Sequence, residues 1–473
     1  MLIHRLLTAA FLAVGVTVRL CGAFHAPTRM HRKIVCSGTD TVTSSSTASS
    51  TTSYSHLRTV DNDYIHQGGE KFQVGIAGAG AVAFATAAIL SKNGHDVMLW
   101  SPSGRGTKDL HANLSADSHV NQRTDQTFLT ASGAMDYHFV PRIAASSEQL
   151  VKENQVVLIC LPANGHKHVF DELAPQLSIS LTCKHVIISS HASLGALYLT
   201  KAVEQYQQQT QLQTKNNELN FPTITAWGTT VCTARRPSGT TVDVKSIRKS
   251  VDLCTIPEQE SPSALKLCQS LFPHTNFQPR DGLLAISLSN LNPQNHLGMA
   301  LGNISRMDKG EAWYQFQMTT PAIGRFLQGL DQERLEIARA LGVDVKTIYE
   351  HFSLSFHVPI SESISDMCQQ IHKSGNDVYG PNTPSSRYIT EDVPFGLVLT
   401  ATLGRMVGRP ALLHESGIMI CNSMYGCDFV AKNDLLQSLK LDEMTLEDLQ
   451  RAIRTGRNVV LDQQQERTPT SVK

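Results

Sequence analysis

The chain has 473 residues and a balanced charge, with 41 Lys and Arg against 41 Asp and Glu. Such a length predicts two or three domains, and the lack of net charge argues against nucleic acid or an acidic membrane surface as a partner. The ten cysteines are scattered and form no CxxC pair. We therefore expect buried thiols, and neither a disulfide framework nor a metal site.

The first 65 residues differ in composition from the rest. An apolar run of 13 residues, Leu6–Val18, is too short to span a bilayer but has the length of a signal-peptide core. After Ala23 a basic segment begins with Phe24, and 14 of the 19 residues 37–55 are Ser or Thr. This two-part leader is typical of proteins sent to plastids of secondary origin, and simple secretion is the alternative. We expect residues 1–65 to stay outside the fold and the mature protein to have no membrane anchor.

A dinucleotide-binding fingerprint opens the folded part. A strand over residues 72–76 runs into Gly78-Ala79-Gly80-Ala81-Val82-Ala83, a G-x-G-x-x-A pattern. Gly78 permits the tight turn, Gly80 lets the backbone approach the pyrophosphate, and Ala83 lets helix and strand pack closely. We expect the pyrophosphate at the positive end of a helix over residues 81–92, which Gly94 would cap.

The residues that follow the second predicted strand (96–100) bear on the choice of cofactor. An NAD site usually has an acidic residue at this point for the ribose hydroxyls. This chain has Ser101, Ser103 and Arg105 instead, and no carboxylate. Two hydroxyls and an arginine favour NADP, and NAD is the alternative.

Continuous apolar runs predict three further buried strands, within residues 154–163, 185–190 and 223–230. Leu161 and Pro162 would then lie at the sheet edge that receives the nicotinamide half of the cofactor. We expect His166 and His191, near strand ends, to be packing or surface histidines. The polar, Gln-rich residues 204–220 are interpreted as a surface insertion.

After about residue 275 the pattern changes to long amphipathic helices, such as residues 325–342. Within that helix Asp331 and Arg334 are interpreted as a surface pair. An α/β Rossmann domain followed by an all-α domain, α+β overall, places the site in the cleft between the two. The predicted segments are a leader at 1–65, a Rossmann domain at 66–275, a helical substrate domain at 276–457 and a polar tail at 458–473.

Three segments of the helical part carry a resemblance to a known family. They are SNLNPQNHLGMALGNI (289–304), TTPAIGRFLQGLDQERLEIARALGV (319–343) and RYITEDVPFGL (387–397). In order and spacing they resemble the opine dehydrogenases of the octopine and nopaline type, over most of residues 72–430. These two-domain NAD(P)-dependent enzymes condense a 2-oxo acid with an amino acid and reduce the resulting imine. The resemblance implies that His296 is the catalytic histidine, that Asp392 is its partner, and that Arg387 lies near the cofactor and substrate cleft.

The residue types suit these roles. Histidine can act as acid and base near neutral pH, a carboxylate on its other nitrogen fixes the tautomer, and the arginine fork binds two carboxylate or phosphate oxygens. Asp392 also suits the N-cap of a helix that begins at Val393-Pro394, and Glu391 is a rival partner for the histidine. The roles of Asn303 and Arg235 are left open.

The sequence thus predicts an NAD(P)-dependent oxidoreductase acting on CH–NH bonds, with a small 2-oxo acid and an amino acid as substrates, as a monomer or homodimer. Glycerol-3-phosphate dehydrogenases and ketopantoate reductases share this architecture and are the alternatives. Enzymes of those families use a catalytic lysine. Residues 289–304 offer a histidine and no lysine. A dinucleotide-binding sensor without turnover is the remaining alternative, and it would need no His–Asp pair.

Overall fold

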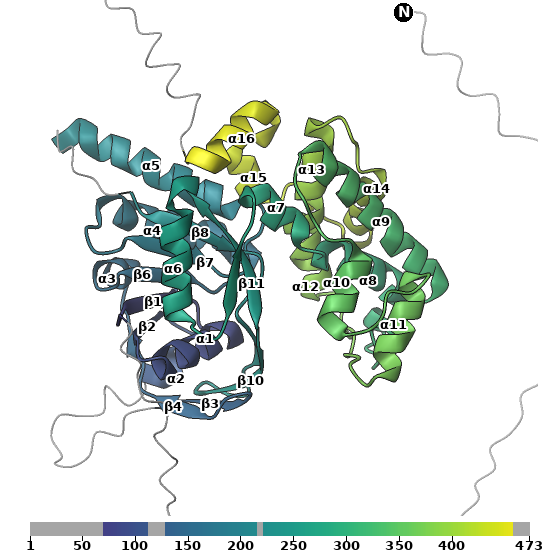
Figure 1. Ribbon diagram of the computed structural model, residues 1–473, viewed down its shortest axis with the longest axis horizontal. Coiled ribbons are helices and arrows are strands. Elements are labelled where there is room, and N and C mark those ends of the chain that lie inside the picture. The colour runs from purple at the N-terminus through teal and green to yellow at the C-terminus, as the bar shows by residue number, and fades with distance from the viewer. Residues whose placement is uncertain (1–69, 112–127, 215–220, 457–473) are drawn as a thin grey trace, which may run out of the picture. The chain divides into compact units, whose positions relative to one another are not determined.

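The computed structural model describes residues 70–456, apart from 112–127 and 215–220 (Figure 1). The predicted leader and the predicted polar tail lie outside these residues and stay predictions. In the described part of the chain, no helix combines the length and apolarity needed to cross a membrane. Of the eight described cysteines, seven are buried and none forms a disulfide.

An eight-stranded sheet is the framework of the first half, as predicted for a Rossmann domain. Its strands are, in spatial order, β12 (Asn276–Pro279), β11 (Ser250–Ile256), β8 (Thr223–Trp227), β7 (His185–Ile188), β6 (Val156–Ile159), β1 (Gln73–Ala77), β2 (Asp96–Trp100) and β5 (Arg142–Ile143). Neighbours are parallel except β8 and β11. Since β1 pairs with both β2 and β6, the strand order reverses there, and open α/β sheets bind ligands at such a switch point.

Helix α1 (Ala81–Lys92) is enclosed between two sheets. It contacts β2 on one side and a four-stranded sheet on the other (Figure 1). Every residue from Ala83 to Leu90 is buried, which is expected of a helix that is apolar all round. The second sheet was not predicted; its strands are β4 (Tyr137–Phe139), β3 (Leu129–Gly133), β10 (Thr241–Ile247) and β9 (Cys232–Arg235).

Further helices complete the sheet half: α2 (Lys108–His111), α3 (Ser147–Lys152), η1 (Ala163–Gly165), α4 (His166–Ile179), α5 (Gly195–Thr214), η2 (Glu258–Glu260) and α6 (Ser261–Leu271). Two expectations need correction. The first part of the Gln-rich stretch, residues 204–214, belongs to helix α5 and is not an insertion. The sheet also extends beyond the predicted boundary at residue 275, because β12 pairs with β11.

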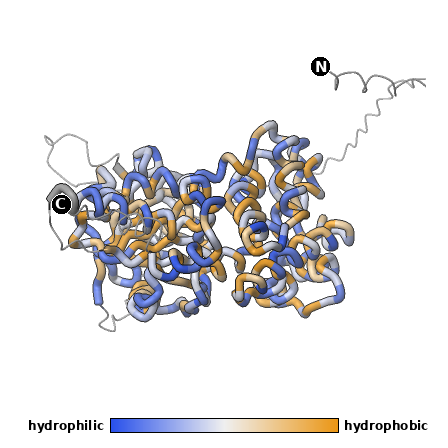
Figure 2. Tube along the Cα trace, turned by 90° about the horizontal axis from the view of Figure 1, so that it is seen from above, coloured by the Kyte–Doolittle hydropathy of each residue, from blue (hydrophilic) through white to orange (hydrophobic). Residues whose placement is uncertain are grey.

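The second half consists of helices, as predicted. They are α7 (Gly282–Ser289), α8 (Asn292–Asp308), α9 (Pro321–Ala340), α10 (Ile348–Phe356), α11 (Ile364–Lys373), α12 (Arg387–Thr390), the π-helix η3 (Val393–Leu397), α13 (Val398–Met406) and α14 (Leu412–Tyr425). The last elements, α15 (Asp434–Leu439), η4 (Leu441–Glu443) and α16 (Leu446–Thr455), return to the sheet half, where α15 contacts α5 and α16 contacts β11. In Figure 2, hydrophobic residues gather in the sheet interior and alternate with hydrophilic ones along the helices.

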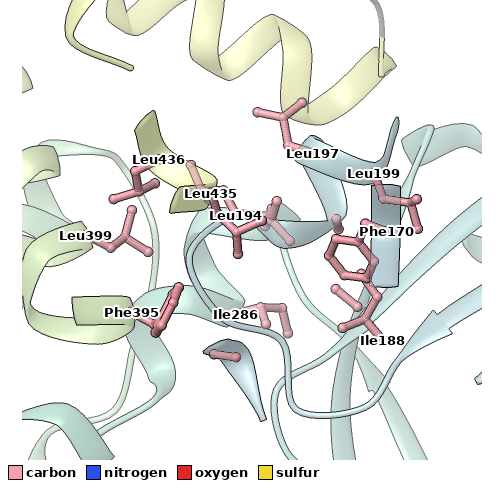
Figure 3. Packing of buried hydrophobic residues seen from close by; sticks show 14 of the residues in the cluster. Phe170, Ile188, Leu194, Leu197, Leu199, Ile286, Phe395, Leu399, Leu435 and Leu436 are labelled. Carbon is pink, nitrogen blue, oxygen red and sulfur yellow. The ribbon is translucent and has the colours of Figure 1, made fainter. Parts of the chain in front are cut away.

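One hydrophobic cluster continues from the sheet half into the helical half. Figure 3 shows Leu194, which follows β7, near Leu435 of α15, with Phe395 of η3 on the helical side. Hydrogen bonds reinforce this junction. Ser193 Oγ donates to the backbone oxygen of Phe395, and Asn433 Nδ2 donates to Ser193 Oγ at 3.0 Å. The loop after β7 is therefore fixed to η3 by both packing and polar contacts.

The pair Asp331–Arg334, expected at the surface, is buried inside the helical half. Arg334 Nη2 lies 2.6 Å from Asp331 Oδ1, and Nη1 donates to the backbone oxygen of Leu288 at 2.5 Å. Asp331 Oδ2 accepts a hydrogen bond from the backbone nitrogen of Ile348 at 2.9 Å. The pair therefore joins α9 to the end of α7 and to the start of α10, and the surface interpretation was wrong.

Removing one partner of this buried pair should destabilise the protein strongly. Asp331→Ala leaves the Arg334 charge buried without its carboxylate, so we expect a loss of about 3–5 kcal/mol in the free energy of unfolding. Denaturant titration measures it, with Arg325→Ala at an exposed site of the same helix as the control, expected within about 0.5 kcal/mol of wild type. Equal effects of the two substitutions would contradict the structural role of the pair.

Candidate active site

The fingerprint turn has the shape that a dinucleotide requires. Gly78 has φ +136°, and a Cβ there would lie 2.4 Å from the backbone oxygen of Cys160, so only glycine fits. At Gly80 a Cβ would meet no atom within 4 Å, which leaves open space beside the turn. No described side chain caps α1, and its first turn has no acidic residue. The backbone N–H groups at this helix end can therefore hold a pyrophosphate.

Arg236, which the sequence did not single out, holds the fingerprint turn in place. Its guanidinium donates to the backbone oxygens of Ala79 (2.5 Å), Gly106 (2.9 Å) and Gly239 (3.1 Å), and lies 4.3 Å from the ring centroid of Phe84. It thus joins the turn to the loop that follows β2. A positive charge at this place also favours an anionic cofactor.

The loop after β2 carries the residues on which the predicted cofactor choice depends. Ser101 Oγ accepts a hydrogen bond from the backbone nitrogen of Gly106 at 3.2 Å, so it stabilises the loop itself. Ser103 and Arg105 are exposed. The structure thus leaves these two side chains available to a ligand.

His296 and Asp392 lie together although 96 residues separate them in the chain. His296 Nδ1 lies 2.7 Å from Asp392 Oδ2, and the side chains are only 12% and 8% exposed. Asp392 occupies the N-cap position of η3, as the alternative predicted, but its carboxylate makes no capping hydrogen bond and pairs with His296 instead. The rival Glu391 instead accepts a hydrogen bond from the backbone nitrogen of Ala163 at 3.1 Å. With Asp392 on Nδ1, the imidazole has Nε2 left for exchanging a proton with a ligand.

Tyr388 fixes the plane of the His296 ring, a role that the sequence did not suggest. The two rings stack with centroids 3.6 Å apart and an angle of 10° between their planes. Its hydroxyl donates to Gln315 Oε1. Burial, aided by the charge of Asp392, raises the pKa of Tyr388 to about 12, while Arg387 and Arg235 oppose the shift. Tyr388 is therefore a neutral stacking surface, and Arg235, whose role was open, lies close enough to affect it.

Arg387 lies at the surface of the site and pairs with Glu391. Its Nε is 3.3 Å from Glu391 Oε2, and its side chain is 63% exposed. Burial raises the pKa of Glu391, and the nearby Arg387 and the N–H of Ala163 partly oppose that shift. Glu391 thus links the loop after β6 to the helical half and orients Arg387.

A crevice of about 30 Å³ lies where the two halves meet, lined among others by Ala163, His191, Asn290, Asn292, Arg387 and Asp392. The predicted Leu161 and Pro162 directly precede Ala163. A larger cavity, of about 510 Å³, is lined by Gln155, Lys184 and His185 at strand beginnings, which is the opposite edge of the sheet from the fingerprint. In the described residues no group of His, Cys, Asp and Glu side chains could hold a metal ion.

Three polar residues of uncertain role can now be placed. His166 is buried with Nε2 3.0 Å from the backbone oxygen of Leu161, and burial lowers its pKa to about 4, so it is the packing histidine that was predicted. His191 is also buried, but it lines the crevice. Asn303 is neither a cap nor in the crevice, because it donates to the backbone oxygen of Met299 at a kink in α8.

Comparison with known proteins agrees with this geometry. Residues 279–425 match the family described as "NAD/NADP octopine/nopaline dehydrogenase, alpha-helical domain", and residues 73–192 match "NADP oxidoreductase coenzyme F420-dependent". The opine dehydrogenase of Arthrobacter sp. (strain 1C) is 26% identical over 391 residues, which cover 80% of this chain and 98% of that relative. Its helical half matches the octopine/nopaline dehydrogenase family, and over most of its length the chain is similar to an opine dehydrogenase. It is thus an NAD(P)-dependent oxidoreductase of the opine dehydrogenase type.

Solved structures show the same two-domain fold. Octopine dehydrogenase in complex with NADH and agmatine superposes with a TM-score of 0.62 at 18% identity, covering 82% of this chain and 98% of that chain. Yersinopine dehydrogenase with NADP⁺ bound superposes with a TM-score of 0.57 at 14% identity, covering 81% and 99% of the two chains. The arrangement of a Rossmann half and a helical half is therefore shared with these two structures.

The buried Glu391 should make the stability of the protein depend on pH. Its folded pKa lies above the ordinary value of 4.5, so the folded state holds a proton that the unfolded state has released, and stability is lost as pH rises through that window. Glu391→Gln keeps an acceptor for Ala163 and avoids burying a charge. We expect the variant to gain thermal stability relative to wild type as pH rises from about 4.5 to 8.

Scanning calorimetry at several pH values measures this difference. Glu311→Gln, which removes a carboxylate from an exposed ion pair with Arg306, controls for the loss of a surface pair. A Glu391→Gln difference that is constant with pH, or that shrinks as pH rises, would show that burial does not penalise the charged carboxylate.

Proposed function

We propose that the protein reduces the imine formed between a 2-oxo acid and an amino acid, with NAD(P)H as the reductant. The observation that carries this proposal is the His296–Asp392 pair at 2.7 Å, with Asp392 also lining the crevice between the cofactor-binding half and the helical half. Octopine dehydrogenase has been solved with NADH and L-arginine, and with NADH and pyruvate. One of these ligands is an amino acid and the other a 2-oxo acid.

The residues of the site suit the proton transfers of this reaction. Condensation joins the amine nitrogen to the keto carbon and releases water, so the departing oxygen must gain protons. His296 supplies a proton through Nε2, while Asp392 holds Nδ1 and stabilises the charged ring. A dinucleotide held by the fingerprint turn would supply a hydride to the imine carbon, and the nitrogen would take up a proton as it receives the electron pair of the C=N bond. Tyr388 restricts the imidazole to one plane throughout.

Arg387 suits the recognition of an anionic group of the substrate. Among the described residues its guanidinium makes one ion pair, with Glu391, and its side chain is largely exposed beside the crevice. The planar fork can hold two carboxylate oxygens at once. Arg387 therefore orients the substrate, and His296 acts on the reacting atoms.

A direct assay tests the proposed reaction. Oxidation of NADPH or NADH, followed at 340 nm, should require both a 2-oxo acid, such as pyruvate, and an amino acid from a panel. His296→Gln should lower kcat by about 10²–10⁴-fold, the usual contribution of a general acid. Oxidation with the 2-oxo acid alone would instead indicate a hydroxy acid dehydrogenase. Dinucleotide binding without any turnover would favour the sensor.

The helical half offers a matched control for this substitution. His372 Nδ1 lies 2.9 Å from Asp377 Oδ2, which is a His–Asp pair of similar geometry. Neither residue lines the crevice. We expect His372→Gln to keep kcat within about threefold of wild type. A comparable loss in both variants would mean that the His296 effect is structural.

The cofactor preference rests on Arg105. We propose that NADP is favoured over NAD, because Arg105 and Ser103 are exposed where the 2′-phosphate belongs and no acidic residue follows β2. Arg105→Ala should raise KM for NADPH by roughly tenfold and leave KM for NADH nearly unchanged, as steady-state kinetics with the two cofactors would measure. An equal rise for both cofactors, or none, would remove Arg105 from the phosphate site.

A further inference from the structure

His191 is a buried side chain whose polar atoms are not satisfied within the protein. The residue is 3% exposed, and neither ring nitrogen has a hydrogen-bond partner among the described residues. Leaving a buried polar group unpaired costs about 1–3 kcal/mol, so such a group in a native structure needs an explanation. His166, nearby and equally buried, differs because its Nε2 bonds to the backbone oxygen of Leu161.

His191 lies at a place in the fold where ligands commonly bind. It follows β7, the neighbour of β6, and so lies at the carboxyl edge of the sheet where ligands of α/β proteins bind. It lines the same crevice as Arg387 and Asp392. Its backbone nitrogen donates to the backbone oxygen of Trp227 at 2.8 Å, and the hydrogen bonds of Ser193 hold the following residues to η3. The backbone that carries the ring is therefore held in place before any ligand binds.

The polar groups around this crevice favour a ligand group that accepts hydrogen bonds. The two carboxylates that line it are already engaged, Asp392 by His296 and Glu391 by Ala163 and Arg387. The Oδ1 of Asn290 accepts from the backbone nitrogen of Asn292, so the amide group of Asn290 remains as a donor. The acceptors named here are thus engaged, whereas the Asn290 amide and the His191 ring can still donate, so a ligand group with acceptor oxygens fits.

The size of the crevice limits which part of a ligand can enter. Its volume of about 30 Å³ exceeds the roughly 10–15 Å³ that one water molecule needs on the same kind of measure. That space suits a small terminal group such as a carboxylate. Burial lowers the pKa of His191 to about 3, so its ring is neutral at physiological pH and offers one N–H donor.

We propose that His191 is a further substrate-contacting residue, whose ring N–H donates to a carboxylate of the substrate in this crevice, beside Arg387. This inference rests on the proposed function for the identity of the substrates. Both the 2-oxo acid and the amino acid carry the required carboxylate. Each arm of the experiment, kinetic and binding, therefore tests both substrates.

The kinetic arm compares His191→Phe, which keeps a ring but removes the donor, with His191→Asn, which keeps a donor. We expect His191→Phe to raise KM for the 2-oxo acid or for the amino acid by at least about tenfold, with kcat and KM for NAD(P)H within about threefold of wild type. His191→Asn should recover part of the affinity. A change confined to KM for NAD(P)H would assign the ring to the cofactor and overturn the proposal.

A control at the other end of β7 distinguishes a substrate contact by His191 from a general effect of the substitution on packing. His185 begins β7 at the opposite edge of the sheet, lines the larger cavity and is half-buried. His185→Phe should leave all three KM values unchanged, and the melting temperatures of the variants would show whether each still folds. Equal effects of His185→Phe and His191→Phe on KM would overturn the assignment.

The binding arm does not depend on turnover. Calorimetry on the protein with NADP⁺ bound would measure Kd for oxalate, an unreactive analogue of a 2-oxo acid, and for L-arginine as the amino acid. Weaker binding of either probe to His191→Phe, by at least about tenfold, supports the contact even if no imine is reduced, in which case only the proposed function fails. If imines are reduced but neither KM nor either Kd changes, the proposed function stands and the role of His191 is refuted.

Discussion

The π-helical turn η3 is the constraint on which the arrangement of the site depends. Asp392, directly before it, reaches His296 of α8. Gly396 within it packs so closely on Pro293 that a Cβ there would lie 2.2 Å from the proline ring. The backbone oxygens of Pro394 and Phe395 accept bonds from Asn433 and Ser193. One turn thus holds together α8, the segment before α15 and the loop after β7, and π-helical turns occur frequently at functional sites.

Two arginines fix the elements next to this turn and next to the cofactor turn. On the helical side, Arg334 and Asp331 join α9 to the elements on both sides of it, including the end of α7 from which α8 starts. On the sheet side, Arg236 reaches from the end of β9 to the fingerprint turn. Both arginines bind backbone oxygens, and such contacts position neighbouring segments rather than side chains. The catalytic geometry therefore depends on charged residues that touch no substrate.

The parts of the fold that follow from local pattern could be predicted from the sequence. The turn at Gly78, helix α1 and the flanking strands depend on neighbouring residues, and each appears where the fingerprint predicts it. The small sheet could not be predicted, because β3 pairs in parallel with β10 more than a hundred residues away and its residues LTASG show little apolar pattern. Strand β12 was missed for a similar reason, since NFQP is polar and ends in proline.

Side-chain environments were harder to predict than elements. Two opposite charges three residues apart have the same sequence pattern on an exposed helix as on a buried one. Asp331 and Arg334 are buried by residues that are distant in sequence. His296 and Asp392 were paired through resemblance to a family, and the structure confirms their contact. Tyr388 lay within the segment that carried the resemblance, yet its stacking on His296 depends on how α12 approaches α8. Nothing in the local sequence distinguishes it from a core tyrosine.

A double-mutant cycle on His296 and Asp392 tests most directly whether the two side chains act as one unit. The measured quantity is kcat for wild type, His296→Gln, Asp392→Asn and the double variant under saturating substrates. If Asp392 acts only through His296, the double variant should lose no more activity than the larger single loss, since residues that act as a unit are strongly non-additive. Losses that multiply in the double variant would show that the two residues contribute independently, and would contradict a site in which Asp392 works through the His296 ring.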